Sequence, residues 1–449
     1  MVLLIIISRG RHTNYANMNT AAFLRAGTVV TISVGLIYYL LGEGSRPSDG
    51  VDSGHGKERK RHGKERKRRG GGRANGSVDD GSPSRKAPPP PQTPGSQPSA
   101  GESVVRAAFD VGSGATKVAI GQCMRVNNGD DFSSYTVCLP LLHEDYREVL
   151  LRHSLTRDKR IPDATLEKCF HVLSTYAAEC RARGCRPRDM FGIATAVFRE
   201  SKNGQAFIDR VARELGIEIC IVSQTLEGRI GHRTALNAAR GSSARHEARS
   251  PAKSRGPRQV ISWDSGGGSF QITDDRGHMY GGKVGSSTAL QIMVEQVQGR
   301  SFMGGASDSC NPCSVEDCRE LLEYLRAHCM PPLADWLVRA TDGGAAAGYR
   351  IISIGGSTCA FRMAEIATGE AIFGAQDVWS AIEHLAGHDD ASLAVLGFPQ
   401  PGMLIPKLVL IYTVMRWVRL HEIEYVATTG STLGLLATSV AELKEDAGL

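Results

Sequence analysis

Two hydrophobic patterns alternate along the chain from Val104 to its end. Short apolar runs bounded by glycine, serine or aspartate predict β-strands, whereas longer segments with apolar residues every three or four positions predict amphipathic helices. Strands are predicted over residues 104–110, 116–122, 190–195, 217–223, 259–264, 268–273, 350–354 and 424–428.

The predicted helices lie between these strands. The clearest, 204–215, carries its apolar residues on one face and is followed by Gly216, which favours a helix end. Alternating strands and helices predict an α/β fold in layers. Helices are predicted over residues 163–183, 204–215, 227–239, 285–297, 315–328, 357–367, 377–386, 402–420 and 431–445.

Two glycine-rich turns indicate the chemistry most directly. They lie in AAFDVGSGATKVAIG, residues 107–121, and VISWDSGGGSFQIT, residues 260–273. In each, a strand ends in an aspartate, Asp110 or Asp264, and the following glycines leave backbone N–H groups open to an anion such as phosphate. The aspartates themselves would repel phosphate and suit a divalent cation bound through water. Two half-sites so far apart in sequence predict a cleft between two lobes.

The same strand-then-glycine pattern occurs twice more, in ISIGGST, which ends at Thr358, and in VATTGST, which ends at Thr432. Each is followed by a predicted helix, whose first turn would add N–H groups and a favourable dipole for an anion. Four such turns in one chain indicate an internally duplicated fold that closes around a chain of phosphates.

Composition separates a polar N-terminal part from the predicted lobes. The chain has 449 residues, of which 41% are hydrophobic and 22% charged, enough for two domains and a tail. Residues 43–103 consist largely of glycine, serine, proline and arginine, so we expect a disordered linker. The heptapeptide HGKERKR occurs twice within it, at 55–61 and 62–68.

The basic run accounts for the net charge of the chain. Residues 57–69 hold nine basic and two acidic side chains, whereas the formal charge of the whole chain is only +6. The remainder is therefore close to neutral. This run is interpreted as a solvated spacer, with binding to anionic lipid or nucleic acid, a localisation signal and capture of a polyanionic substrate as alternatives. No specific nucleic-acid partner is predicted.

The N-terminal segment contains one uncharged apolar stretch. Residues 26–42 lack charged side chains, and a helix of that length spans roughly 26 Å at about 1.5 Å per residue. We expect residues 1–42 to form a membrane anchor or a targeting segment. An anchor with the catalytic part facing the cytosol agrees with the basic linker. The alternative is an organellar signal, mitochondrial or plastid, because no acidic residue precedes Glu43.

The eleven cysteines argue against a secreted disulfide framework, because their number is odd and they are scattered through predicted core elements. Four of them fall within 20 residues and begin with the sequence CNPC. A zinc site is one interpretation, and reduced structural thiols are the favoured one, since two of the four border or lie in the helix predicted from Ser314. The four are Cys310, Cys313, Cys318 and Cys329.

The order of motifs resembles the exopolyphosphatase/guanosine pentaphosphate phosphohydrolase (Ppx/GppA) family. The motifs are FDVGSG, ATAVFRES, SQTLEGRI, WDSGGGSFQ, SIGGST and PKLVLI…ATTGST, and they cover residues 104–440. The resemblance implies the two-lobed actin-like ATPase fold, a duplicated ribonuclease H-like architecture. It implies a lobe I over 104–240, a lobe II over 258–430, and a C-terminal helix over 431–449 that is able to cross back to lobe I.

The same resemblance implies a phosphohydrolase that releases terminal phosphate from inorganic polyphosphate or from guanosine penta- or tetraphosphate with Mg²⁺ or Mn²⁺. By this resemblance, Glu227 corresponds to the general base, Arg199 to a cation that holds phosphate, and Asp110 and Asp264 to metal ligands. The expected phosphate-binding residues are Gly112, Ser113, Gly114, Lys117, Gly266, Gly267, Gly268, Ser269, Gly355 and Gly356. A homodimer is also reasonable for this family.

Two departures from the family pattern keep other functions open. Gln271 stands where the family usually has a glutamate. The ecto-apyrases also have a glutamine at this position, and there it helps to position the attacking water. Lys117 resembles the phosphate-contacting lysine of actins and sugar kinases. The alternatives are therefore an apyrase-like nucleoside di- or triphosphatase and a catalytically weak sensor of polyphosphate or nucleotide.

Overall fold

The computed structural model describes residues 103–126, 134–246, 259–304, 308–342 and 349–449. The segment 1–42, expected to be an anchor or targeting signal, lies outside these residues, as does the linker up to residue 102. Both expectations therefore remain predictions. No helix within the described ranges is long and apolar enough to cross a membrane.

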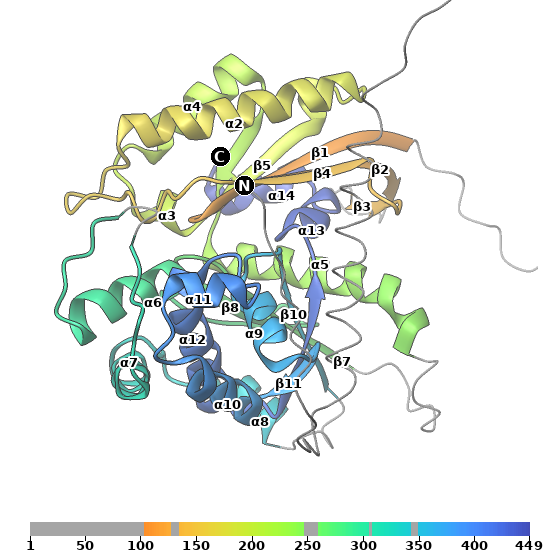
Figure 1. Cartoon of the computed structure of the whole chain (residues 1–449). Coiled ribbons are helices and arrows are strands. Elements are labelled where there is room, and N and C mark those ends of the chain that lie inside the picture. The colour runs from red at the N-terminus through yellow and green to blue at the C-terminus, as the bar shows by residue number, and fades with distance from the viewer. Residues whose placement is uncertain (1–102, 127–133, 247–258, 305–307, 343–348) are drawn as a thin grey trace, which may run out of the picture. The chain divides into compact units, whose positions relative to one another are not determined.

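The first lobe is built on a six-stranded mixed sheet (Figure 1). The order across it is β3-β2-β1-β5-β6, and β4 pairs with the first half of β2. The central strand β1 is antiparallel to β2 and parallel to β5. The strands are β1 (Ser103–Val111), β2 (Ala115–Val126), β3 (Ser134–Val137), β4 (His143–Glu148), β5 (Met190–Ala194) and β6 (Glu218–Ile221).

The second lobe is built on another six-stranded sheet, in the order β11-β12-β10-β7-β8-β9. Its central strand β7 is antiparallel to β8 and parallel to β10. The strands are β7 (Gln259–Ser265), β8 (Phe270–Asp274), β9 (Met279–Gly282), β10 (Tyr349–Gly355), β11 (Ile372–Gly374) and β12 (Glu422–Ala427).

The two sheets share one topology. In each, three antiparallel strands follow one another along the chain, and two later strands lie parallel to the first of the three. The predicted duplication is thus confirmed. Asp110 in β1 lies opposite Lys117 in β2, and Asp264 in β7 lies opposite Gln271 in β8. The two aspartates therefore hold equivalent positions in the two halves.

Helices cover both faces of the first sheet. The buried side chains of α2 and α4 pack on one face, while α13 and α14, from the end of the chain, pack on the other together with the start of α5. The C-terminal helices therefore return to the first sheet. The helices of this part are α2 (Asp163–Ala182), the 3-10 turn η1 (Pro187–Asp189), α3 (Ala196–Glu200), α4 (Gly204–Leu215), α5 (Gln224–His246), α13 (Thr432–Leu436) and α14 (Val440–Ala447).

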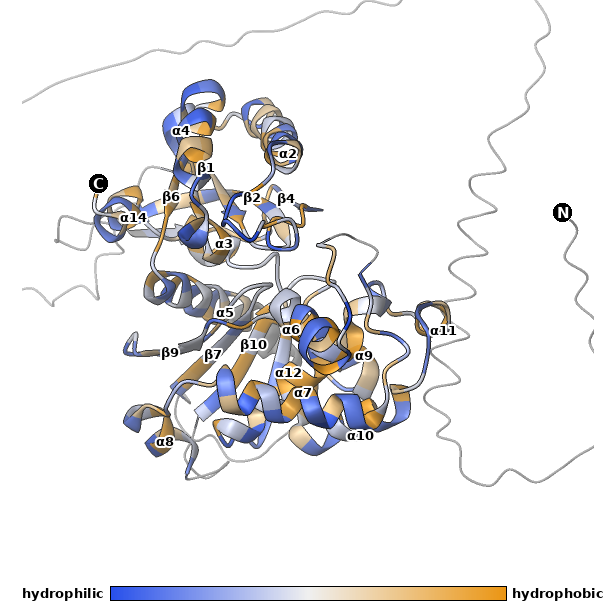
Figure 2. Ribbon diagram, turned by 90° about the vertical axis from the view of Figure 1, so that its left-hand side faces the viewer, coloured by the Kyte–Doolittle hydropathy of each residue, from blue (hydrophilic) through white to orange (hydrophobic). Residues whose placement is uncertain are grey.

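The largest apolar core lies in the second lobe, where Trp263 packs edge-on against Phe361 and α12 is buried along most of its length. Figure 2 shows hydrophobic stretches in the strands β7 and β10 of this lobe. The other face of the second sheet packs against α5. The helices here are α6 (Ser286–Ile292), the π-helical turn η2 (Met293–Val297), α7 (Val315–His328), α8 (Asp335–Thr341), α9 (Ala360–Thr368), α10 (Ala375–Leu385), α11 (Asp390–Val395), the 3-10 turn η4 (Pro401–Met403) and α12 (Leu404–Trp417).

One predicted helix is divided. The segment 431–445 forms two helices, α13 and α14, because the side chain of Ser439 accepts a hydrogen bond from the backbone N–H of Glu442 and so begins a new helix. The predicted helices 204–215 and 315–328 are confirmed with the same bounds. The short elements β3, β4, β9, β11, α3, α8 and α11 were not predicted.

Replacement of Gly434 by alanine should destabilise the protein. A Cβ atom at this position in α13 would lie 2.1 Å from the carbonyl oxygen of Ile230 and 2.6 Å from the backbone nitrogen of Thr234, both in α5. Because backbone atoms of a packed helix cannot move aside, we expect the free energy of unfolding to fall by about 1–3 kcal/mol or more in urea titrations.

Gly231→Ala, on α5, is the matched control. Its Cβ would meet its nearest neighbours at 3.5 Å, an ordinary van der Waals distance. Alanine in a helix interior should then stabilise the protein by up to about 1 kcal/mol. Equal stability of the two variants would contradict close α5–α13 packing.

Candidate active site

A cleft of about 1090 Å³ lies between the two sheets and is lined from both lobes. It contains the ends of β1 and β7, the turns that follow them, and the loops after β10 and β12. Every residue predicted for the site lines this cleft except Arg199 and Gln271. The sequence motifs, spread over some 250 residues, therefore converge on one place.

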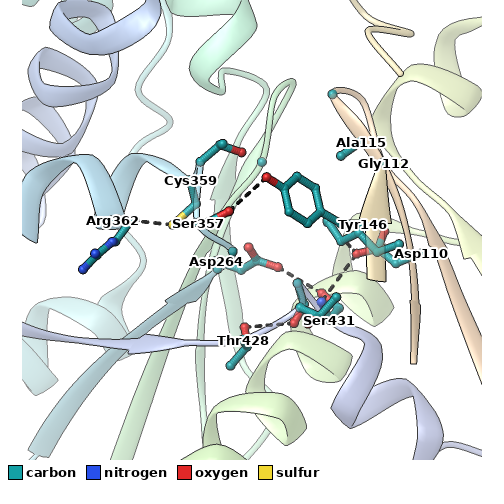
Figure 3. A pocket seen from close by; sticks show the side chains of 18 of the residues that line it. Asp110, Gly112, Ala115, Tyr146, Asp264, Ser357, Cys359, Arg362, Thr428 and Ser431 are labelled. Carbon is teal, nitrogen blue, oxygen red and sulfur yellow. Dashed lines mark hydrogen bonds and ion pairs between the residues drawn. The ribbon is translucent and has the colours of Figure 1, made fainter. Parts of the chain in front are cut away.

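The two predicted metal ligands face a single serine. The backbone N–H of Ser431 donates to Oδ2 of Asp110 at 3.4 Å, and its hydroxyl donates to Oδ2 of Asp264 at 3.1 Å. Figure 3 shows the two carboxylates reaching Ser431 from opposite sides. The ammonium of Lys117 forms an ion pair with Oδ2 of Asp110 at 2.8 Å. The predicted phosphate-binding lysine thus also neutralises one aspartate.

The glycine-rich turns of the two lobes touch. A Cβ at Gly267 would lie 3.2 Å from Cβ of Ser113, and a Cβ at Gly268 would lie 3.1 Å from its Oγ. Side chains at these glycines would crowd the serine of the opposite turn, so the approach depends on their absence. The predicted phosphate-binding residues of the two turns consequently form one continuous wall.

A third loop contributes residues that were not assigned to the site from sequence. Gly430 adopts a positive φ of 59°, and a Cβ there would lie 2.5 Å from Nζ of Lys117. Ser431 follows it and contacts both aspartates. The sequence did contain a signal for this loop, because VATTGST repeats the strand-then-glycine pattern. No local pattern, however, showed that the loop reaches Asp110 and Asp264 at the ends of β1 and β7.

Glu227 lies in the first turn of α5 and is only 9% exposed. Arg199, at the end of α3, donates to Oε2 of Glu227 at 2.8 Å and to the carbonyl of Val222 at 2.9 Å. Burial, with help from Asp264 and Asp110, raises the pKa of Glu227 to about 7, although Arg199 opposes the rise. Near neutral pH this carboxyl can therefore accept a proton. Arg199 holds the glutamate and does not line the cleft.

Gln271 lies beside the site. It is 2% exposed, and its amide donates to Oγ of Ser269 at 3.0 Å. Directly opposite residues of antiparallel strands project from the same face, so Gln271 neighbours Asp264. Its side chain supports the glycine-rich turn of the second lobe.

The carboxylates of the cleft influence one another. Burial raises the pKa of Asp264, and the charge of Asp110 adds to the rise, although Lys117 opposes it. Burial alone would lower the pKa of Lys117, but Asp110, Asp264 and Glu227 outweigh it, and the pKa is raised. Lys117 is therefore firmly cationic, and three carboxylates face two basic side chains, Lys117 and Arg199.

The donor set fits a divalent cation bound largely through water. Within the described residues no group of three or more histidine, cysteine or acidic side chains is arranged to bind a metal directly. Mg²⁺, however, commonly keeps several waters and uses one or two carboxylates together with substrate phosphates. Asp110 and Asp264, which converge on Ser431, offer that pair.

Residues of β4 line the cleft and contact loops of the second lobe. The hydroxyl of Ser357, after β10, donates to Oη of Tyr146 at 3.0 Å (Figure 3). On either side, Glu144 accepts a hydrogen bond from Thr429, and Glu148 accepts one from Gln400. One strand of the first lobe thus contacts three loops of the other wall.

The clustered cysteines lie away from this cleft. Cys310, Cys313 and Cys318 are buried in the core of the second lobe, and Cys329 is partly buried against it. All four are free thiols. The zinc interpretation finds no metal-binding group among the described residues. The helix that follows begins at Ser314 with the expected capping box to Asp317.

Comparison with known proteins agrees with this geometry. Residues 130–273 match the Ppx/GppA phosphatase family. The comparison with curated proteins gave no significant match. The matched segment includes Arg199, Glu227 and Asp264, and so covers part of both walls of the cleft.

Several solved structures share the fold. A Ppx/GppA family member from Aquifex aeolicus is 15% identical with a TM-score of 0.51, over 77% of this chain and 99% of that one. An exopolyphosphatase from Cytophaga hutchinsonii is 13% identical with a TM-score of 0.52, over 77% and 98%. An exopolyphosphatase-like protein is 17% identical with a TM-score of 0.52, over 75% and 97%.

At such identities the structures show the fold alone, which is the actin-like arrangement of two duplicated lobes expected from the motifs. The match over residues 130–273 confirms the resemblance to the Ppx/GppA phosphatase family, and the solved structures confirm the two-lobed fold.

Proposed function

We propose that this protein is a phosphoanhydride hydrolase that releases the terminal phosphate of inorganic polyphosphate or of guanosine penta- or tetraphosphate. The observation that supports this most is the position of Glu227. It is a buried carboxyl with a pKa near neutrality, held by Arg199, and it borders a cleft lined by glycine-rich turns. This combination suits activation of water beside a bound phosphate chain.

In the proposed reaction, water attacks the terminal phosphorus in line with the bond to the leaving phosphate, and Glu227 takes its proton. Arg199 keeps the carboxylate oriented through the 2.8 Å hydrogen bond. Gly112 and Gly266 use their backbone N–H groups to close the two turns, so the N–H groups that would bind the phosphate oxygens are those of Ser113–Gly114 and Gly267–Gly268, with Lys117 beside them.

Asp110 and Asp264 would hold Mg²⁺ or Mn²⁺ through water. When bound, such an ion neutralises phosphate charge and favours departure of the leaving group. An apyrase-like nucleoside di- or triphosphatase is the second candidate, favoured by the neutral Gln271 next to Asp264. Phosphate release from polyphosphate, guanosine pentaphosphate, ATP and ADP, compared side by side, distinguishes the two.

The variant Glu227→Gln tests the assignment of the base. It keeps the size of the side chain but cannot accept the proton, so kcat should fall by about 10²–10⁴ while KM changes little. Phosphate release by the full-length protein, with each candidate substrate and with Mg²⁺ or Mn²⁺, measures this.

Glu167→Gln is the matched control. Glu167 also pairs with an arginine, Arg210, but on the exposed surface of α2. It should retain wild-type activity. An unchanged kcat in Glu227→Gln would exclude this residue as the base.

The pH dependence should report the same group. Because the base acts when ionised, kcat/KM should rise with pH and level off above about 7, the pKa to which burial raises Glu227. Arg199 lowers that pKa. In Arg199→Met the midpoint of the rise should therefore move to higher pH, whatever the loss of activity. A midpoint at the pH of an ordinary glutamate, or one that stays in place in Arg199→Met, would contradict the proposal.

A further inference from the structure

A lysine is buried on the wall of the cleft opposite β4. Lys407, in the first half of α12, is 2% exposed, and its helical neighbours Leu404, Ile405 and Leu408 are fully buried. Removing an ammonium group from water costs several kcal/mol unless an opposite charge compensates. The environment of this side chain therefore needs an explanation.

The partners of Lys407 are neutral. Its Nζ donates to the carbonyl oxygen of Thr358 at 2.7 Å and to Oε1 of Gln400. Among the described residues, no carboxylate lies within ion-pair distance of it. Burial lowers the pKa of Lys407 to about 8, and the partial compensation comes from Cys359 and from Glu148. The structure thus holds a buried cation without its counter-charge.

Lys407 lines the same cleft as the proposed catalytic residues. Three basic side chains line that cleft, together with seven acidic ones. Lys117 is paired with Asp110, and Arg362 is paired with Glu365. Lys407 is therefore the basic side chain of this lining that has no carboxylate partner among the described residues, and a phosphate chain entering the cleft would find its charge available.

We propose that Lys407 forms an anion subsite with the loop Gly355–Thr358, which binds an inner phosphate of the substrate, one that is not hydrolysed. The proposal rests on the proposed function, because it takes the cleft to hold a chain of phosphates. The terminal phosphate lies at Glu227 and Lys117, and Lys407 neutralises a phosphate further along the chain. The buried cation then gains its counter-charge only in the complex.

The competing explanation is structural. Lys407 holds the carbonyl of Thr358 and so could simply fix the loop after β10. The two roles predict opposite effects of an apolar replacement. A purely structural lysine would destabilise the protein when lost. A cation awaiting an anion would, when replaced by methionine, leave the free protein at least as stable, because the desolvation cost disappears.

The test uses full-length Lys407→Met and Lys407→Gln, with Lys168→Met on the exposed face of α2 as control. Tripolyphosphate binding in the presence of Mg²⁺ is measured by calorimetry, each variant carrying Glu227→Gln to prevent turnover. Glutamine can still donate to Thr358 but carries no charge. We expect both Lys407 variants to bind tripolyphosphate about 10- to 100-fold more weakly, as for a lost hydrogen bond to a charged group. In the Glu227→Gln background, Lys407→Met should melt at or above the temperature of the parent, and Lys168→Met should match the parent in both measurements.

Three results would overturn the proposal. The first is an unchanged tripolyphosphate affinity in Lys407→Met, the second is an affinity in Lys407→Gln equal to that of the Glu227→Gln parent, and the third is the absence of binding by that parent. The proposed function fails separately. If wild-type protein binds tripolyphosphate in a Lys407-dependent manner but releases no phosphate, the subsite stands and hydrolysis does not. If it releases phosphate with the same KM and kcat in Lys407→Met, hydrolysis stands and the subsite does not.

Discussion

The burial of three carboxylates around one cleft is the constraint on which the site depends. Burial raises the pKa of Glu227 and of Asp264, the charge of Asp110 adds to both rises, and each buried carboxylate would cost several kcal/mol if left uncompensated. Two ion pairs compensate this cost in part, Lys117 with Asp110 and Arg199 with Glu227, and Ser431 donates hydrogen bonds to both aspartates. Because the carboxylates still outnumber these cations, the cluster retains a negative charge. In the proposed reaction, backbone N–H groups and a divalent ion would offset this charge when phosphate binds.

Duplication of the fold places the aspartates, but the two halves have diverged in what surrounds them. Asp110 lies opposite Lys117, whereas the equivalent partner of Asp264 is the neutral Gln271. The first lobe thus supplies its cation from the strand next to the aspartate. The second lobe supplies Lys407 from a helix, α12, on the other side of the loop after β10. A near-symmetric scaffold in this way carries an asymmetric distribution of charge, which would suit the extended substrate of the proposed function.

The sequence was informative wherever a local pattern determined the structure. The strands ending in Asp110 and Asp264, with their glycine-rich turns, were predictable because apolar runs and glycines act over a few residues. Contacts across the fold were not: nothing near Ser431 shows that it bridges two aspartates, and the helical pattern around Lys407 resembles ordinary core. Helix 431–445 was predicted as continuous because its sequence pattern is otherwise favourable for a helix. The capping by Ser439 competes with this pattern and begins a second helix. Arg199 was expected to hold phosphate, but its guanidinium is hydrogen-bonded to Glu227 and does not line the cleft.

Strand β4 shows most clearly why an element that lines the cleft can lack a sequence signal. Its sequence, HEDYRE, contains no apolar alternation, because neither face enters the core. Alternate residues from Glu144 to Glu148 instead line the cleft and contact loops of the second lobe. Exposed polar contacts of this kind contribute about 1 kcal/mol or less each. The packing of α5 on α13 leaves much less room for movement, because Gly434 lies against the backbone of α5. The packing of α5 on α13 should therefore resist displacement more strongly than the polar contacts between β4 and the loops of the second lobe.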